Sequence, residues 1–172
     1  MPRLSVTLVP IEIKILRAGD EAILDRVADV FDDPVDVAAS REFLADARHR
    51  LAVALDEGIV VGFVSAVLYV HPDKPRPELW INEVGVAETH QGRGLGRSLM
   101  EAILENARAL GCGEAWVLTD RANAAAMRLY ASAGGRLAPG DTVMFEFSLD
   151  EGQGSLKDGH GHPNRAPRDS TD

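Results

Sequence analysis

The chain has 172 residues, and its 27 Asp and Glu residues outnumber its 18 Lys and Arg residues, which gives a formal net charge of −9. A chain of this length predicts one domain that buries roughly 70% of its extended-chain surface. Hydrophobic residues make up 45% and charged residues 26%, which excludes a wholly disordered chain. The acidic balance argues against nucleic-acid binding, which depends on clustered Lys and Arg, and it permits a cationic partner.

Cysteine content and apolar runs narrow the setting further. Cys112 is the only cysteine, so an intramolecular disulfide and a thiolate metal cage are both excluded. Residues 1–10 lack the apolar stretch and the cleavage site of a signal peptide. The longest apolar run, 59–70, contains Gly62 and Ser65 and is too short to span a bilayer. We therefore expect a cytoplasmic protein with no membrane or nucleic-acid partner.

The first part of the chain predicts one strand and two helices. Alternating apolar residues indicate a strand over 11–17. Asp20 is expected to cap a helix that runs toward Pro34, because apolar residues follow it at helical spacing. These residues are Ile23, Val27, Val30 and Phe31. A weaker helical period predicts a second helix over 37–48.

The middle of the chain predicts a hairpin and a further strand. Two runs rich in β-formers, 51–55 and 59–70, flank the turn 56–58 and indicate a hairpin. Segment 71–77 is expected to be a loop, because its three prolines lack the N–H that a ladder needs. The next strand is predicted over 79–86.

The remaining elements follow a polar, Gly-rich turn over 88–94. A strong amphipathic helix is predicted from Leu95 to Leu110, with Gly111 closing it. We then expect a strand over 114–119, a helix over 123–133 and a final strand over 142–149. Beyond Asp150 almost no large apolar residues remain, so burial cannot offset the ordering entropy. The prediction is one domain over 1–149 and a disordered tail over 150–172.

The most informative stretch is a strand, a turn and a helix over 84–98. Glycines in Gln91-Gly92-Arg93-Gly94-Leu95-Gly96 let the backbone approach a ligand and point successive N–H groups toward it. The first turn of the helix adds unpaired N–H donors and the positive end of its dipole, so the stretch suits a phosphate or pyrophosphate. Arg93 and Arg97 can add positive charge. The alternative is that the turn only connects two elements.

Two familiar phosphate loops do not match this stretch. A Walker A loop ends in Gly-Lys-Ser/Thr, whereas this one ends in Gly96-Arg97-Ser98. A dinucleotide fingerprint needs Gly-x-Gly-x-x-Gly, whereas the glycines here are spaced two apart.

Two segments resemble the GNAT superfamily of N-acetyltransferases. Gln91–Gly96 is similar to its Gln/Arg-x-x-Gly-x-Gly/Ala loop, and Asn123-Ala124-Ala125-Ala126-Met127-Arg128-Leu129-Tyr130 is similar to its Asn-x-x-Ala-x-x-Leu-Tyr helix. The resemblance implies an α/β fold whose mixed, mostly antiparallel sheet is flanked by helices. It also implies a splayed strand pair that admits acetyl-CoA, and it requires no metal.

The resemblance also implies roles for individual residues. Residues implied to bind acetyl-CoA are Val84, Gly85, Val86, Gln91, Gly92, Arg93, Gly94, Leu95, Gly96, Arg97, Ser98, Asn123 and Ala126. Tyr130 is implied to donate a proton to the departing thiolate. Asn123 and Tyr130 are seven apart and share a helical face. The alternative for Tyr130 is a half-buried core tyrosine.

Acetyl transfer needs a neutral amine, so a base must accept the amine proton, and Glu83 is the best candidate. It shares strand parity with Leu79 and Ile81, which predicts a carboxylate directed toward the apolar interior. Alternatively, Asn82 and Glu83 mark a β-bulge that turns the side chain into a cleft. A third interpretation is a solvent-facing glutamate.

A further resemblance, to aminoglycoside 3-N-acetyltransferases, concerns the acceptor. It is carried by 31–34, by 71–84 and by 145–150, and in that group the base on this strand is usually Asp. The predicted acceptor-binding residues are Asp32, Asp33, Asp36, Glu78, Trp80, Asp120 and Glu146. For the acidic residues the alternatives are helix caps and a solvated surface, and Trp80 is either core or a wall of the site.

The sequence therefore predicts an acetyl-CoA-dependent N-acetyltransferase that acetylates a primary amine of a cationic small molecule, an aminoglycoside by resemblance, in a ternary complex. One alternative is a related enzyme that acts on a polyamine, an amino-acid derivative or a protein N-terminus. Another is a CoA-binding module without catalysis, against which the presence of both Glu83 and Tyr130 argues. A homodimer is left open.

Overall fold

The computed structural model describes residues 10–140, 144–145 and 147. It divides into two units, 1–135 and 136–172, and every helix and strand named below belongs to the first unit. The predicted strand over 142–149 lies outside the described residues apart from Met144, Phe145 and Phe147. The predicted tail over 150–172 lies outside them entirely.

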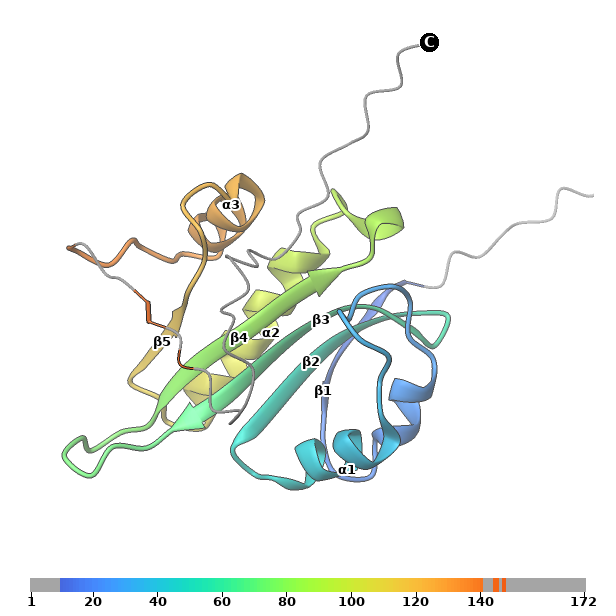
Figure 1. Ribbon diagram of the computed structural model, residues 1–172, viewed down its shortest axis with the longest axis horizontal. Helices are drawn as coiled ribbons and strands as arrows, with labels where there is room; N and C mark the ends of the chain where they lie inside the picture. The colour runs from blue at the N-terminus through green and yellow to red at the C-terminus, as the bar shows by residue number, and fades with distance from the viewer. Residues whose placement is uncertain (1–9, 141–143, 146, 148–172) are drawn as a thin grey trace, which may run out of the picture. The chain divides into compact units, whose positions relative to one another are not determined.

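Five strands form one sheet in the order of the sequence (Figure 1). They are β1 (Glu12–Leu16), β2 (His49–Asp56), β3 (Ile59–Tyr69), β4 (Glu78–Val86) and β5 (Glu114–Val117). β1 to β4 pair antiparallel, and β5 lies parallel to β4 because a helix connects the two. The mixed, mostly antiparallel sheet and the β2–β3 hairpin are therefore confirmed.

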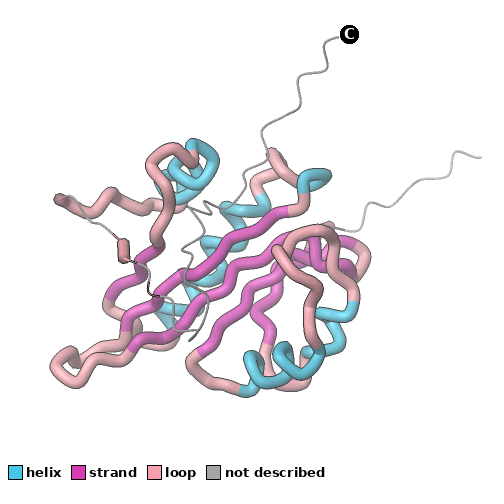
Figure 2. The backbone as a smooth tube through the Cα atoms, viewed as in Figure 1, coloured by secondary structure: helices cyan, strands magenta, loops and turns pink. Residues whose placement is uncertain are grey.

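Helical segments connect and flank the strands (Figure 2). They are the 3₁₀ turns η1 (Glu21–Asp25) and η2 (Glu88–His90) and the helices α1 (Val37–Ala45), α2 (Leu95–Ala109) and α3 (Ala124–Ser132). Within the described residues, every helix is too short or too polar to cross a membrane. The amphipathic helix predicted from Leu95 is confirmed as α2.

The helix predicted after Asp20 is wrong beyond its first turn, since only η1 forms there. The Asp20 carboxylate does not cap a helix; it accepts hydrogen bonds from Lys14 Nζ at 2.7 Å and from the Arg17 amide at 3.0 Å. Val27 forms a parallel bridge with Val60 at the start of β3, and the Ala28 amide donates to the Val60 carbonyl at 2.9 Å. Pairing with the sheet therefore overrides the helical spacing of the apolar residues.

The two faces of the sheet bury separate apolar clusters. On one face, called the α2 face, Leu99 and Ile103 of α2 pack with Val64, Leu79 and Ile81 of the sheet. On the other, called the α1 face, η1 and α1 contribute to a cluster with strand residues of β1, β2 and β3 (Figure 1). Among the described residues, this second cluster includes none from β4 or β5. Within the part of the chain that the structure describes, α1 and η1 therefore cover only the β1–β3 half of the α1 face.

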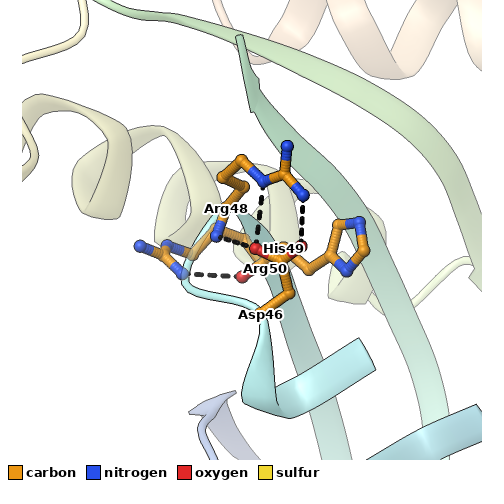
Figure 3. Close-up of polar contacts among 4 residues, drawn as sticks. All are labelled: Asp46, Arg48, His49 and Arg50. Carbon is orange, nitrogen blue, oxygen red and sulfur yellow. Dashed lines mark hydrogen bonds and ion pairs between the residues drawn. The ribbon is translucent and has the colours of Figure 1, made fainter. Parts of the chain in front are cut away.

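A carboxylate sets the turn between α1 and β2 (Figure 3). Asp46 accepts hydrogen bonds from the Arg48 amide at 2.9 Å and from Arg48 Nε and Nη2 at 3.1 and 2.7 Å. The Arg48 guanidinium holds the pKa of Asp46 well below its usual range. This turn ends α1 at Ala45, three residues before the predicted end, and β2 begins at His49, whose ring stacks on Phe43 at 4.5 Å.

Candidate active site

A β-bulge in β4 determines where the proposed base lies. Ser65 is opposite Glu83 but its neighbour Ala66 is opposite Ile81, so Asn82 is an extra residue in β4. Ile81 packs on the α2 face, whereas Gly85 lies on the α1 face, since a Cβ on it would be 2.6 Å from Phe63. Glu83 shares the parity of Gly85 and lies on the α1 face. The inward orientation inferred from parity with Leu79 is wrong, and the predicted β-bulge is present.

The bulge also marks the point where β4 and β5 separate. The parallel ladder runs from Glu78 opposite Glu114 to Ile81 opposite Val117 and then ends. β4 continues to Val86 paired with β3, and within the described residues no strand lies on its other edge beyond the bulge. The predicted splayed strand pair is present, and Figure 1 shows the two strands diverging. An extended ligand can pair with the backbone at this edge.

The Gly-rich turn leads from the end of β4 into α2. Gly92 and Gly94 have φ of 73° and 81°, which L-residues rarely adopt, and a Cβ on either would meet open space. Gly94 is the N-cap of α2, so among the described residues no side chain caps this helix. Asp36 and Asn123, by contrast, cap α1 and α3 through their side chains. The first N–H groups of α2 can therefore donate to a phosphate.

Two side-chain contacts hold this turn in place. Gln91 Nε2 donates to the Val86 carbonyl at 3.1 Å, which ties the turn to the end of β4. His90 Nε2 lies 2.9 Å from Asp56 Oδ2 in the β2–β3 turn, and His90 Nδ1 lies 2.8 Å from Thr89 Oγ1. The sequence analysis missed the His90–Asp56 pair, because its members are 34 residues apart and no local pattern connects them.

The charge near this turn is partly offset within the chain. Arg97 Nε donates to Glu101 Oε1 at 2.8 Å, one helical turn along an exposed face of α2. Arg93 and Ser98 are exposed beside the turn.

The second motif lies next to the first. A Cβ on Gly96 would be 3.3 Å from Leu129, so the start of α2 packs closely against α3. Asn123 Oδ1 accepts from the Ala126 amide at 3.0 Å, which caps α3 and leaves its side-chain NH₂ as a donor. Tyr130 is half-buried against the α2-face core, and burial raises its pKa. The hydroxyl is therefore protonated at neutral pH and can act as an acid.

Two of the predicted acceptor-binding residues, Asp32 and Asp33, lie on the α1 face, at the end of the sheet where Glu83 lies. Phe31 stacks on Phe63 at 4.1 Å between ring centroids, and Asp32 and Asp33 follow it directly. Because Phe63 is opposite Gly85, segment 30–33 lies along the same end of the α1 face as Glu83. Both carboxylates belong to exposed residues.

The other predicted acceptor residues are placed differently. Asp36 Oδ1 accepts from the Ala39 amide at 2.7 Å, so the helix-cap alternative is confirmed for it. The Glu78 carboxylate binds Lys74 and lies 3.3 Å from His71 Nε2, and the Lys74 ammonium lowers the pKa of Glu78. The charge of Glu78 is therefore offset by Lys74, in the loop that precedes β4. Asp120 is exposed after β5, and Glu146 lies outside the described residues.

Trp80 has an aromatic partner that the sequence analysis did not identify. It stacks on Trp116 of β5, with ring centroids 5.3 Å apart and planes inclined by 9°. The two residues are opposite each other in the β4–β5 ladder, and both are partly exposed. Trp80 is therefore neither fully core nor fully exposed.

A cavity of about 360 Å³ lies elsewhere, between η1 and the start of α1. Its lining residues are Glu21, Leu24, Asp25, Val27, Pro34, Val35, Val37 and Ser40, and none of them is a predicted site residue. The candidate active site is thus the region along β4 from the bulge to the Gly-rich turn.

The arrangement of a bulged β4, a splayed β5 and a Gly-rich turn into α2 agrees with the family comparison. The model of the Acetyltransferase (GNAT) family matches residues 20–134, so the chain belongs to this family. Streptothricin acetyltransferase from Streptomyces lavendulae is 33% identical over 112 residues, which cover 65% of this chain and 57% of that protein. Mycothiol acetyltransferase from Streptosporangium roseum is 42% identical over 64 residues, which cover 37% of this chain and 18% of that protein.

This chain aligns with nearly the whole length of solved structures that have the same fold. An aminoglycoside acetyltransferase from an uncultured soil metagenomic sample, in complex with sisomicin, has a TM-score of 0.67 and 22% identity over 81% of this chain and 97% of that chain. An aminoglycoside N-acetyltransferase in complex with CoA has a TM-score of 0.64 and 18% identity over 82% and 96%. At these identities the likeness concerns the fold.

Proposed function

We propose that the chain is an acetyl-CoA-dependent N-acetyltransferase that acetylates an amine of a cationic small molecule, with an aminoglycoside-type compound as the acceptor. The observation that carries the proposal is the bulge at Asn82. It places Glu83 on the half-covered face at the point where β4 leaves β5, on the strand that leads into the Gly-rich turn. The proposed base Glu83 and the Gly-rich turn proposed to bind the pyrophosphate are thereby connected by the last residues of β4.

The residues present suit acetyl-CoA, which supplies an activated acetyl thioester when bound. The N–H groups from Gly92 to Arg97, which no side chain caps, are donors for its pyrophosphate, and Arg93 and the Ser98 hydroxyl lie exposed beside them. The outer edge of Val84–Val86 offers backbone groups to an extended arm. Asn123 and Ala126 belong to the first turn of α3, whose Leu129 packs closely against Gly96 at the start of α2.

In the proposed mechanism, two side chains move protons. Glu83 accepts the proton of the incoming ammonium, directly or through a water, so that the amine becomes a nucleophile. A backbone N–H of β4 polarises the acyl carbonyl. Tyr130, whose raised pKa keeps it protonated, donates its hydroxyl proton to the departing sulfur.

Charge and the printed names of similar proteins support a cationic acceptor. Asp32 and Asp33 lie along the same end of the α1 face as Glu83, where they can attract ammonium groups. Proteins similar to this chain include a streptothricin acetyltransferase and an aminoglycoside acetyltransferase in complex with sisomicin.

The test is CoA-thiol release from acetyl-CoA with a panel of amines. The panel contains sisomicin, streptothricin, spermidine, a free amino acid and a peptide with a free N-terminus. We expect the highest kcat/KM with sisomicin or streptothricin. Highest turnover with spermidine or the peptide would overturn the acceptor, and tight acetyl-CoA binding without turnover of any amine would overturn the enzyme assignment in favour of a CoA-binding module.

A further inference from the structure

The register of the sheet places a row of residues that includes both tryptophans next to Glu83. His49, Val67, Trp80 and Trp116 are opposite one another across β2, β3, β4 and β5. Val67 is two residues from Ser65, which is opposite Glu83, so the row of Trp80 lies about 7 Å along the sheet from the row of Glu83.

Trp80 and Trp116 lie on the same face as Glu83. Trp80 stands between Leu79 and Ile81 in β4, and both of these pack on the α2 face. Likewise, Trp116 stands between Ala115 and Val117, which pack against the α2-face core. Side chains alternate along a strand, so both indoles belong to the α1 face.

This part of the α1 face is not covered by α1 or η1. The apolar cluster that these elements form includes strand residues of β1 to β3 and, within the described residues, none of β4 or β5. Two large aromatic residues are thus left partly exposed beside the proposed base. Their stacked rings, 5.3 Å apart, form one broad aromatic surface.

The charges around this surface define the ligand that fits it. Glu83 lies on one side of the pair, and beyond it Asp32 and Asp33 add two exposed carboxylates. On the other side the Glu78 carboxylate binds Lys74 and lies 3.3 Å from His71 Nε2. An amine attached to a ligand that covers the indoles is therefore within reach of Glu83, one pair of strand positions away.

We propose that Trp80 and Trp116 form an acceptor subsite for the ring of a cyclic polyamine, in which the ring lies against the indoles while an attached amine reaches Glu83. Indole surfaces attract cations and the apolar faces of saturated rings. A linear polyamine has no ring face to place there. The subsite therefore selects cyclic over linear amines. This inference rests on the proposed function.

The chain contains two tryptophans, both in this pair, so fluorescence excited selectively at tryptophan reports on the pair without a contribution from the two tyrosines. Sisomicin is titrated into the protein in the presence of saturating CoA, which blocks turnover. We expect a saturable change in tryptophan emission, and a smaller change with spermidine at equal occupancy measured by calorimetry. Equal changes with the two ligands, or bound sisomicin with no change, would overturn the subsite.

Kinetics of Trp116→Leu give the second measurement. We expect the ratio of kcat/KM for sisomicin to kcat/KM for spermidine to fall about tenfold. Trp116→Phe keeps an aromatic ring and is expected to restore most of the ratio, which also guards against a folding defect in the leucine variant. Leu110→Ala, an exposed residue at the end of α2, is the control.

The two measurements separate this inference from the proposed function. Sisomicin turnover with an unchanged ratio in Trp116→Leu overturns the subsite and leaves the acetyltransferase intact. A fluorescence response to sisomicin without CoA release from any amine supports the subsite and overturns the proposed enzyme.

Discussion

The two faces of one sheet differ in how completely they are covered. On the α2 face, α2 lies across the strands, and Leu99 and Ile103 have 0% exposure. On the α1 face, Phe63 under η1 and Phe31 is buried, whereas Trp80 and Trp116 remain partly exposed. The covered face supplies the buried apolar area that stabilises the fold, and the half-covered face leaves room for a ligand.

A β-bulge in β4 determines which of these faces Glu83 occupies. Without the bulge, with Asn82 in regular alternation, Glu83 would follow the parity of Leu79 and Ile81 into the α2 core, where a carboxylate costs several kcal/mol. With the bulge at Asn82, Glu83 and Gly85 both lie on the α1 face. The bulge thus transfers a carboxylate from the stabilising face to the face proposed for catalysis.

The largest expected effect is on activity, from Glu83→Gln on the half-covered face. The variant keeps the size of the side chain but cannot accept the amine proton, so kcat is expected to fall about 10²- to 10⁴-fold. Thiol release at neutral pH measures it. Glu105→Gln, an exposed residue of α2, is the matched control. Full turnover of Glu83→Gln would show that another group is the base.

Leu99→Ala tests the covered face. Deleting a side chain with 0% exposure leaves a cavity among closely packed residues, so the free energy of unfolding is expected to fall by about 2 to 5 kcal/mol. Urea unfolding measures it, with Leu110→Ala as the exposed control. Activity per folded molecule should change little. A loss of stability no larger than that of the control would contradict the division of roles between the faces.

A smaller effect is expected where the β2–β3 turn supports the Gly-rich turn. Asp56→Ala removes the partner of His90 Nε2, so the turn loses about 1 kcal/mol of support, and the KM for acetyl-CoA should rise about fivefold. The KM for the amine is expected to change less, because Glu83 is not part of this contact. Asp29→Ala, an exposed control, should leave both KM values unchanged. Equal increases in both KM values would contradict a role specific to the Gly-rich turn.

The smallest effect concerns the turn between α1 and β2. The pKa of Asp46 is lowered in the folded state, so its contribution to stability is complete above its usual value of 3.8 and is lost as the pH falls below that value. Asp46→Asn should therefore lower the Tm slightly at pH 7, and the difference should shrink toward pH 3. The effect is small because the ion pair is exposed to solvent. A difference that grows on acidification would contradict this assignment.

Local patterns predicted most elements because those elements depend on nearby residues. The β2–β3 hairpin follows from two β-rich runs around Asp56, Glu57 and Gly58, and α2 follows from its amphipathic period. The predicted helix after Asp20 failed for the opposite reason. Val27 forms a β-bridge with Val60, which is 33 positions further along the chain. The helical spacing of nearby residues cannot predict that pairing.

By itself, the sequence determined the Gly-rich turn, its position before an amphipathic helix, and the second motif that ends at Tyr130. These features depend on glycine conformation and on helical periodicity, which are properties of short segments. The sequence also identified Glu83 as a candidate base, but it left three orientations open.

Only the tertiary structure decided which face Glu83 occupies and what lies beside it. Strand register depends on hydrogen bonds with a neighbouring strand, so the extra residue Asn82 became evident only when β3 was paired with β4. The same holds for Trp80 with Trp116 and for His90 with Asp56, since each pair is joined by the packing of distant segments. The chemistry-bearing residues were visible in the sequence, and their partners were assigned by the fold.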